Sequence, residues 1–259
     1  MSATSPQVAQ RLRRIQNALG VTADGMLGPE TLTALEARLD LVASRKTISL
    51  TCSRKALELI LHFEIGSRAQ YERLYAHPIW PGGESGVTIG IGYDLGFTSK
   101  QQIEADWDPF LEKPERAALA AVQGAKGAVA EQLARGLRHI NIPLAAAEAV
   151  FYASTLPRFA RITRDAFPGV EALPLDAQGA LLSLVFNRGA SHTGERRKEM
   201  RAIRDELSGG SSLARIAEQL EAMQRLWPDA RGLRERRVRE AEFVRGSRRR
   251  YLTGEQVDL

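Results

Sequence analysis

A glutamate stands where an apolar side chain is expected, at the end of the segment SRKALELILHFE. Leu57, Ile60, Leu61 and Glu64 follow one another at intervals of three, one and three residues. In an α-helix these positions share one face, so Glu64 would continue a buried stripe at the helix C-terminus. Burial and the negative end of the helix dipole should both raise the pKa of this carboxyl. A glutamic acid protonated near neutral pH can act as a general acid. The alternative is a helix-ending glutamate that bends out to solvent.

A second group of reactive side chains lies in SGVTIGIGYDLG, residues 85–96. Apolar residues and glycines alternate there, as in a β-hairpin, and Thr88 and Asp94 are six residues apart. A glycine-rich strand is a weak strand, so we expect the segment to serve something other than stability. Its glycines would let a ligand approach the backbone closely. For Asp94, the alternative is an ordinary turn aspartate.

The two segments together resemble the active-site signature of the phage-type lysozymes, glycoside hydrolase family 24. In that family a glutamate ends the first helix of the catalytic domain, and a glycine-rich hairpin supplies a threonine in a T-I-G-x-G run. Glu64 and Thr88 stand at these places. The usual aspartate, six residues before the threonine, is replaced here by Gly82. In the pesticin-like branch the aspartate follows the threonine, which favours Asp94 and leaves Glu84 as the alternative.

The resemblance implies a mainly α, lysozyme-like α+β fold with one small β-hairpin in the cleft. It implies hydrolysis of the β-1,4 bond between N-acetylmuramic acid and N-acetylglucosamine in peptidoglycan. Glu64 would protonate the leaving oxygen, while Asp94 and Thr88 would hold the attacking water. An inverting enzyme needs about 6.5–9.5 Å between its carboxyl groups and a retaining one about 5–5.5 Å; the resemblance favours inversion. We expect no cofactor and no metal, because the four histidines show no ligand spacing.

Two later segments add to the resemblance. ALLSLVFNRG, residues 180–189, is similar to the family's later core helix, where Asn187 would contact sugar or cap the helix. GLRERRVREAEFVRG, residues 232–246, is similar to its arginine-rich terminal helix. The surrounding stretch 231–250 contains nine arginines and three glutamates. It is either a solvated helix face with a basic end or an electrostatic footprint for an anionic polymer.

The N-terminal segment LRRIQNALGVTADGMLGPETLTAL resembles a peptidoglycan-binding domain with the pattern L-Q…G…DG-x-x-G-x-x-T. Asp24, Gly25, Gly28 and Thr31 stand at the matching places, and the resemblance implies that they bind the cell wall. The alternative is a helical adapter without binding activity. We therefore expect a small three-helix domain over residues 1–45 and a lysozyme-like catalytic domain over 46–259.

The elements that must position these groups are predicted to be helices almost throughout. Val8, Leu12, Ile15 and Leu19 share one face of a helix over 6–20. Prolines and glycines predict a loop over 66–83. The remaining periodic segments predict helices at 53–64, 99–105, 114–122, 126–138, 144–165, 174–187, 195–207, 212–226 and 232–245.

Composition bounds the partners of the chain. A net charge of +5 over 259 residues suits attraction to an anionic polymer such as the glycan strands of peptidoglycan. Nucleic acid is not expected, because the basic stretch has only Phe243 and Tyr251 for stacking. No apolar run reaches 18 residues, so we expect no membrane insertion. Cys52 is the single cysteine, which excludes an intrachain disulfide and indicates a structural thiol.

The N-terminus has no hydrophobic region of a secretory signal, so we expect a protein that is made in the cytoplasm and reaches the wall by another route. We also expect it to be a monomer. The sequence names neither that export route nor an immunity protein. Two alternative functions stay open: a lytic transglycosylase, which needs one glutamate and no held water, and a wall-binding protein that has lost catalysis.

Overall fold

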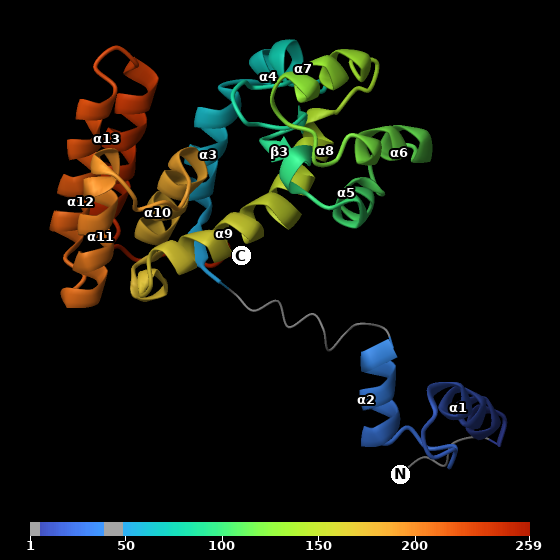
Figure 1. The fold of residues 1–259 in the computed structure, drawn as a ribbon. Coiled ribbons are helices and arrows are strands. Elements are labelled where there is room, and N and C mark those ends of the chain that lie inside the picture. The colour runs from blue at the N-terminus through green and yellow to red at the C-terminus, as the bar shows by residue number, and fades with distance from the viewer. Residues whose placement is uncertain (1–5, 39–48) are drawn as a thin grey trace. The chain divides into compact units, whose positions relative to one another are not determined.

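The computed structural model describes residues 6–38 and 49–259 (Figure 1). The chain divides into two units, Met1–Ile48 and Ser49–Leu259. The expected boundary between residues 45 and 46 lies outside the described residues. The described part of the first unit holds two helices, α1 (Pro6–Leu19) and α2 (Pro29–Arg38), so the expected third helix is not among them.

The apolar face predicted for α1 is not a buried face. Val8 is 47% exposed and Ile15 is 42% exposed. The fully buried side chain of this helix is Gln16, which is 0% exposed and bonds to the turn between the two helices. The helical prediction is confirmed, but a polar residue rather than an apolar stripe joins α1 to that turn.

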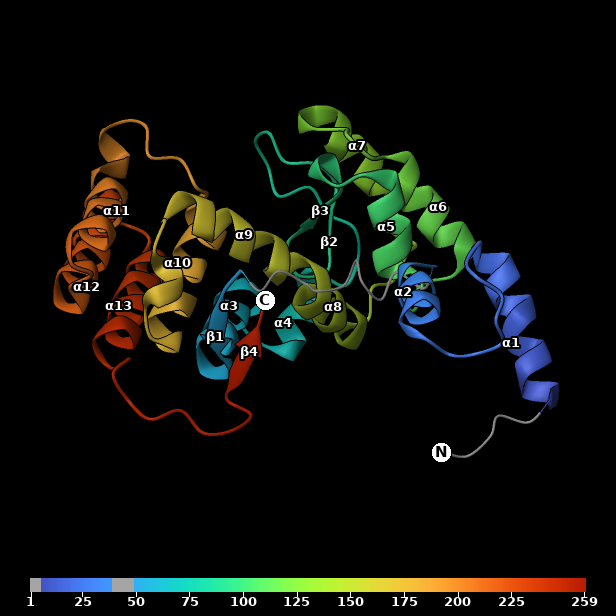
Figure 2. The ribbon, with the colours of Figure 1, turned by 90° about the horizontal axis from the view of Figure 1, so that it is seen from below.

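In the second unit, two groups of elements lie on either side of α3 (Arg54–Ile65) and a long helix (Figures 1 and 2). The first group contains α4 to α7 with a β-hairpin, and the second contains α10 to α13. The long helix consists of α8 and α9, joined by the π-helical turn Phe151–Thr155. Pro157 follows this turn; it lacks an N–H, so the hydrogen-bond ladder of an unbroken helix cannot continue through it. The bounds are α4 Arg68–Leu74, α5 Lys100–Trp107, α6 Lys113–Ala121, α7 Gly127–Gly136, α8 Leu144–Val150, α9 Leu156–Ala166, α10 Leu175–Arg188, α11 Lys198–Gly209, α12 Leu213–Ala222 and α13 Arg231–Arg245.

The core of this unit is built around α10, whose residues from Asp176 to Val185 are all buried. Helix α3 packs against it, and Gly179 makes the crossing possible. A Cβ atom at Gly179 would overlap the Cβ of Ala56. Ser53 caps α3 by accepting a hydrogen bond from the backbone N–H of Ala56 at 3.2 Å. The helix that ends in Glu64 is therefore held at its start by a cap and along its length by the core.

The predicted hairpin is present as β2 (Thr88–Ile89) and β3 (Tyr93–Asp94), which pair antiparallel. Thr88 is directly opposite Asp94 in the register. Gly90 and Gly92, with φ of 57° and 66°, form the turn in a backbone region that other residues rarely adopt. The expectation of a mainly helical fold with a small hairpin is confirmed.

Two elements were not predicted. Helix α4 lies inside the segment 66–83 that was expected to be a loop; its buried Tyr71 donates a hydrogen bond to the carbonyl of Ile142 at 2.9 Å. The prolines and glycines that predicted a loop follow this helix, at residues 78–83. A second two-stranded antiparallel sheet pairs β1 (Thr51–Ser53) with β4 (Gln256–Asp258). Three-residue strands this far apart in the chain leave no local pattern in a sequence.

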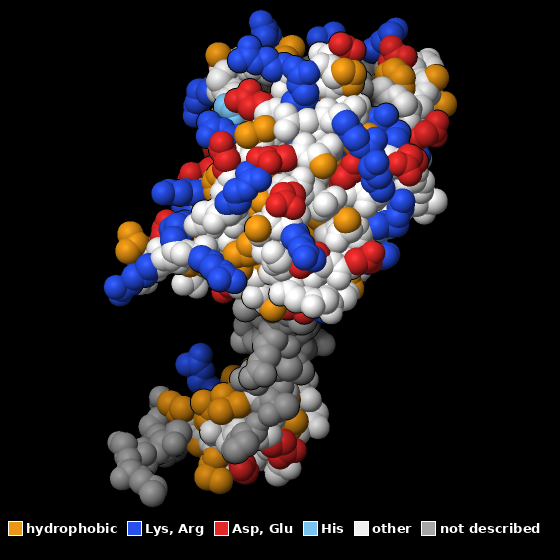
Figure 3. Space-filling model, turned by 90° about the vertical axis from the view of Figure 1, so that its left-hand side faces the viewer, with side chains coloured by type: hydrophobic (Ala, Val, Ile, Leu, Met, Phe, Trp, Pro, Cys, Tyr) orange, Lys and Arg blue, Asp and Glu red, His pale blue; other side chains and the backbone are white. Residues whose placement is uncertain are grey.

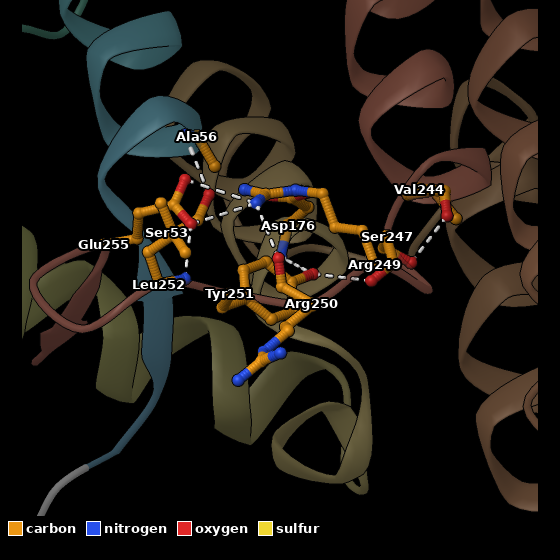
Figure 4. A network of polar contacts seen from close by, with 10 residues as sticks. All are labelled: Ser53, Ala56, Asp176, Val244, Ser247, Arg249, Arg250, Tyr251, Leu252 and Glu255. Atoms are coloured by element: carbon orange, nitrogen blue, oxygen red, sulfur yellow. Dashed lines mark hydrogen bonds and ion pairs between the residues drawn. The ribbon is translucent and has the colours of Figure 1, made fainter.

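The C-terminal segment returns to the start of α3 and is tied there by a polar network (Figure 4). Arg249 bonds to the Asp176 carboxylate at 2.7 Å and to Glu255 at 3.1 Å. Tyr251 donates to the carbonyl of Ser247 at 2.6 Å and accepts from the N–H of Asp176. This network joins the chain end to the first turn of α10.

None of the helices in the described part of the chain combines the length and apolar character that a bilayer-spanning segment needs.

Candidate active site

The largest described pocket, about 630 Å³, lies where α3, the hairpin, α9 and α10 meet. All three predicted catalytic residues, Glu64, Thr88 and Asp94, line it. The two segments that the sequence analysis joined therefore do meet at one cavity. The other lining residues are Pro81, Ser85, Gly92, Phe97, Arg158, Phe159, Ile162 and Phe186.

Glu64 reaches this pocket from the last turn of α3, with its side chain 26% exposed. Its Oε1 forms an ion pair with Nη1 of Arg236 at 2.7 Å, and the Arg236 side chain is only 3% exposed. Sequence analysis offered two alternatives, a carboxyl on an apolar face and a carboxyl turned to solvent. The observed side chain lies between these two, since it is partly buried, and it has a cationic partner 172 residues away in the chain.

Arg236 belongs to a buried cluster of charges between α10 and α13. Glu240 accepts from Arg236 at 3.4 Å, from Arg237 at 2.7 Å and from the Ser183 hydroxyl at 2.6 Å, all through Oε1. Arg237 and Glu240 are both fully buried. Charges are expensive to bury unless they are paired and hydrogen-bonded, so this cluster locks α13 against α10 in one arrangement.

The arginines of residues 231–250 divide between exposed positions, as expected for a solvated face, and interior or paired ones. Arg236 and Arg237 are interior residues. Arg245 pairs with Glu221 and Arg249 with Asp176, across to other helices. On the face drawn in Figure 3, lysine and arginine side chains are interspersed with acidic ones and do not form one continuous patch.

Asp94 both builds the hairpin and lines the pocket. Its Oδ1 accepts from the N–H of Gly96 at 2.8 Å, and both carboxylate oxygens accept from the N–H of Gly86 at 3.1 Å. A side chain on Gly86 would overlap this carboxylate, which explains the glycine there. The turn role considered as the alternative for Asp94 is therefore real, and it places the carboxylate at the pocket.

Thr88 is 7% exposed, and its hydroxyl donates to the carbonyl of Gly86 at 3.3 Å. Behind the hairpin, Tyr93 donates to the Asp106 carboxylate at 2.7 Å. Burial and the neighbouring Asp106 raise the pKa of Tyr93, so its hydroxyl stays a donor and holds β3 against α5. The hairpin wall of the pocket is thus rigidly supported from behind.

Glu84 and Asn187, the other two site residues predicted for this unit, lie outside the pocket. Glu84 is exposed and does not line the pocket. Asn187 lines a neighbouring pocket, and its Oδ1 accepts from Nη2 of Arg237 at 3.3 Å. The structure therefore separates these two residues from the three predicted catalytic ones.

Phe97 and Arg158 also line the pocket and were not singled out from the sequence. Phe97 is 61% exposed, and Nζ of Lys126 lies 3.6 Å from its ring centroid. Arg158, on α9, donates to the Thr98 hydroxyl at 3.2 Å. Phe97 directly follows the hairpin motif, and an exposed aromatic there is a signal that could have been used. Arg158 gives no comparable signal in the sequence.

The remaining titratable groups do not suggest a metal centre. Among the described residues, no three histidine, cysteine, aspartate or glutamate side chains gather in a way that could hold a metal ion. Cys52 is fully buried, and burial raises the pKa of its thiol well above the ordinary range. The thiol is therefore a core group, as expected from the sequence.

In the N-terminal unit, the residues matched to wall binding build the turn between α1 and α2. Nε2 of Gln16 donates to Oδ1 of Asp24 at 2.7 Å and to the Thr31 hydroxyl at 2.9 Å, while its Oε1 accepts from the N–H of Gly25 at 2.8 Å. The N–H of Met26 and the Gln16 amide lower the pKa of Asp24. Three of the four matched residues thus have a structural role here, and wall binding stays a prediction.

The turn requires a glycine at position 25. Its φ is 77°, and a Cβ there would lie 3.0 Å from the carbonyl oxygen of Ala9. Gly28, the fourth matched residue, has no neighbour within 4 Å of the corresponding position. Only Gly28 of the four is therefore unconstrained by packing.

No protein-family model matches the chain, and no curated protein matches it in sequence. The residues around the largest pocket, and their geometry, are therefore what a function must be argued from.

Proposed function

We propose that the protein is a lysozyme-type peptidoglycan hydrolase with a lysozyme-like catalytic domain. It cleaves the β-1,4 bond between N-acetylmuramic acid and N-acetylglucosamine. One observation carries the proposal: Glu64, Thr88 and Asp94 line one open pocket, although they come from a helix and from a separate hairpin. A pair of carboxyl groups facing a shared cavity is the arrangement by which most glycoside hydrolases cleave a glycosidic bond.

Glu64 is the general acid. Its Oε1 is held by Arg236, so Oε2 is the oxygen left to carry a proton toward the glycosidic oxygen. Arg236 also fixes the direction of the carboxyl group, which a proton donor needs. The proton of Glu64 passes to the leaving sugar, the proton released by the attacking water passes to solvent, and the glutamate then accepts one again from solvent.

Asp94 and Thr88 act on the other side of the bond. Both oxygens of Asp94 accept hydrogen bonds from backbone N–H groups, an environment that suits an acceptor-only carboxylate. Asp94 stabilises the positive charge that develops on the sugar, and with Thr88 it holds the attacking water. Phe97 offers an exposed aromatic face on which a sugar ring can stack.

The cavity of about 630 Å³ is in the range of ligand sites that bury most of a small ligand. Its substrate is the glycan strand, and the first unit serves as a second point of attachment to the wall. The reaction uses no cofactor, and the protein acts as a monomer.

The test is clearing of purified peptidoglycan by equal amounts of folded wild type, Glu64→Gln, Asp94→Asn and Glu84→Gln. The first two substitutions should reduce the rate by at least about 100-fold, as expected for loss of an acid or of a charge-stabilising group. Glu84→Gln is the matched control, because Glu84 is exposed and outside the pocket. A wild type that clears nothing would move the wall-binding alternative to the front.

One observation favours a second candidate, a lytic transglycosylase. Both oxygens of Asp94 already accept from hairpin N–H groups, a structural role that alone would leave Glu64 as the only reacting carboxyl. Such an enzyme forms an anhydro-sugar without water. Mass spectrometry of the products separates the two, since hydrolysis adds the mass of one water molecule.

A further inference from the structure

A second pocket, about 580 Å³, lies beyond the C-terminal end of α10. Asn187 lines it, and the preceding residue, Phe186, lines the candidate active site. The two pockets are therefore lined by consecutive residues of α10, whose Cα atoms are about 3.8 Å apart. The other lining residues are Arg188, Thr193, Gly194, Glu195, Arg196, Arg197 and Trp227.

Three guanidinium groups line this pocket without a carboxylate partner. Among the described residues, no ion pair is formed by Arg188, Arg196 or Arg197. Arg188 donates to the carbonyl of Arg196 at 2.7 Å and to the sulfur of Met223 at 3.1 Å. Arg197 donates to the carbonyl of Arg188 and to a methionine sulfur.

These donations go to neutral acceptors, so no ion pair offsets the positive charge of the three arginines; the buried Glu199, which pairs with Arg225, acts on Arg188 only from a distance. Elsewhere in this unit, arginines such as Arg225 and Arg249 meet carboxylates at 2.6 and 2.7 Å. The single carboxylate of the pocket lining, Glu195, has a side chain that is 75% exposed and pairs with Lys198 at 3.4 Å. It therefore does not neutralise the three arginines.

Electrostatic repulsion within the pocket acts on the guanidinium groups themselves. Burial, together with the nearby charges of Arg197 and Arg237, lowers the pKa of Arg188 to about 10. Burial and Arg196 lower the pKa of Arg197. Behind the wall, Arg237 is fully buried and its Nε and Nη1 have no hydrogen-bond partner. A bound anion would relieve this repulsion.

We propose that this pocket binds a carboxylate group of the peptides attached to the glycan strand. The inference rests on the proposed function, because it takes a glycan strand bound in the active site as the carrier of these peptides. Guanidinium forks recognise planar carboxylates through two parallel hydrogen bonds. Arg188 lies 5.0 Å from the ring centroid of Trp227, which holds the guanidinium plane against an aromatic face.

Arg196 is the exposed cation of the pocket. Its side chain donates to the carbonyl of Leu226 over a long 3.4 Å, so its guanidinium remains accessible to a ligand. Arg188 and Arg197 are partly buried and are held by their bonds to carbonyl oxygens. Three cations lining one pocket suit a ligand that can engage several donors at once.

The experiment measures binding of a free peptide released from peptidoglycan to the full chain by calorimetry. The same peptide with its carboxylates amidated is the comparison ligand. Wild type should bind the free peptide, the amidated peptide should bind at least about tenfold more weakly, and Arg196→Gln should lose a similar factor. Arg135→Gln is the matched control, because Arg135 is exposed on α7 and pairs with Glu131.

Three outcomes overturn the inference. One is absence of binding to wild type, another is equal binding of the amidated peptide, and the third is an Arg196→Gln protein that binds as wild type does. Inorganic phosphate is titrated alongside; if it alone binds, the pocket serves a phosphate-bearing polymer instead. Hydrolysis of peptide-free glycan by the same preparation tests the proposed function separately, so the two failures cannot be confused.

Discussion

At the scale of single residues, Arg236 connects the candidate acid to the interior. It bonds at once to Glu64 at the pocket and to Glu240 in the core. One guanidinium therefore serves two carboxylates with very different exposure, 26% for Glu64 and 0% for Glu240. The direction of the Glu64 carboxyl is therefore set by the Arg236 side chain, which is itself buried and paired in the core.

This dual role predicts that Arg236→Met is costly. Removing one partner from a buried charge cluster leaves the others uncompensated, which typically destabilises a protein by about 3–5 kcal/mol. We expect urea denaturation of Arg236→Met to show a loss of this order. Glu64→Gln, the matched variant, keeps a carbonyl oxygen that can accept from Arg236, and it should lose about 1 kcal/mol or less. Equal denaturation midpoints for Arg236→Met and wild type would contradict the role given to the cluster.

The residues of the pocket were partly predictable. Glu64, Thr88 and Asp94 each stand in a local pattern, a helical stripe or an alternating hairpin, and the sequence displays such patterns directly. Arg236 has no such pattern, because its partner lies 172 residues away and only the folded chain brings them together. The cap alternative for Asn187 is wrong, because α10 continues to Arg188 and Gly189 caps it; the Asn187 side chain instead accepts from Arg237, which no local pattern indicates.

At the scale of elements, the crossing of α3 and α10 determines where Glu64 stands. The two helices approach closely at Gly179 and Ala56. Gly179→Ala places a Cβ against that of Ala56, and overpacking of this kind costs about 1–3 kcal/mol. Thermal unfolding should show a lower midpoint for Gly179→Ala. Gly136→Ala is the control, since nothing lies within 4 Å of its added Cβ, and it should be neutral or stabilising by up to about 1 kcal/mol.

The connection after α10 predicts a pH dependence of stability. Burial and the positive charges of Arg204 and Arg197 lower the pKa of His192 below its ordinary value of 6.5. The folded state therefore favours the neutral ring, and the unfolded state binds more protons as the pH falls through that value. This contribution is fully present above pH 6.5 and is lost as the pH falls through the lower, folded-state pKa.

The measurement is the urea midpoint of wild type and His192→Gln between pH 7.5 and pH 5. Wild type should lose more stability than the variant over this interval, because the variant has no ring to protonate. Parallel curves would show that His192 does not titrate as its surroundings indicate. Carboxylates contribute mainly at lower pH, so their titration does not obscure the comparison.

Helices whose own sequence shows an apolar periodicity were predicted, whereas strands that pair with a distant segment of the chain were not. The helices from α5 to α13 were predicted within a few residues, because each shows an apolar face and a proline, glycine or cap near its ends. Strands β1 and β4 were not predicted, since three residues of each strand pair across about 200 positions of the chain. Helix α4 was missed because the prolines and glycines at residues 78–83, which follow it, were used to predict a loop over the whole segment 66–83.

At the scale of the whole molecule, the second unit is closed by its own chain end. Strand β4 pairs with β1, and β1 leads directly into α3, which carries Glu64. Arg249 ties the same chain end to Asp176 at the start of α10 (Figure 4). The C-terminal segment therefore holds both α3 and α10, the helices on which the pocket depends. Its removal should change the geometry of the pocket and lower the stability of the unit.

Arg249→Gln tests this closure. Asp176 is 7% exposed, and without the guanidinium its carboxylate is left partly buried without a cation, at a cost of about 2 kcal/mol. Arg245→Gln is the matched control: Arg245 and Glu221 are 43% and 35% exposed, and surface pairs of this kind contribute about 0–1 kcal/mol.

The same ion pairs predict a pH dependence. The backbone N–H of Leu252 and the guanidinium of Arg249 lower the pKa of Glu255, so wild type should lose this part of its stability as the pH falls below about 4.5. Arg249→Gln should lose less stability over the same pH range, because it lacks the guanidinium. Equal denaturation midpoints for Arg249→Gln and Arg245→Gln at pH 7 would mean that the chain end is held by β4 pairing alone.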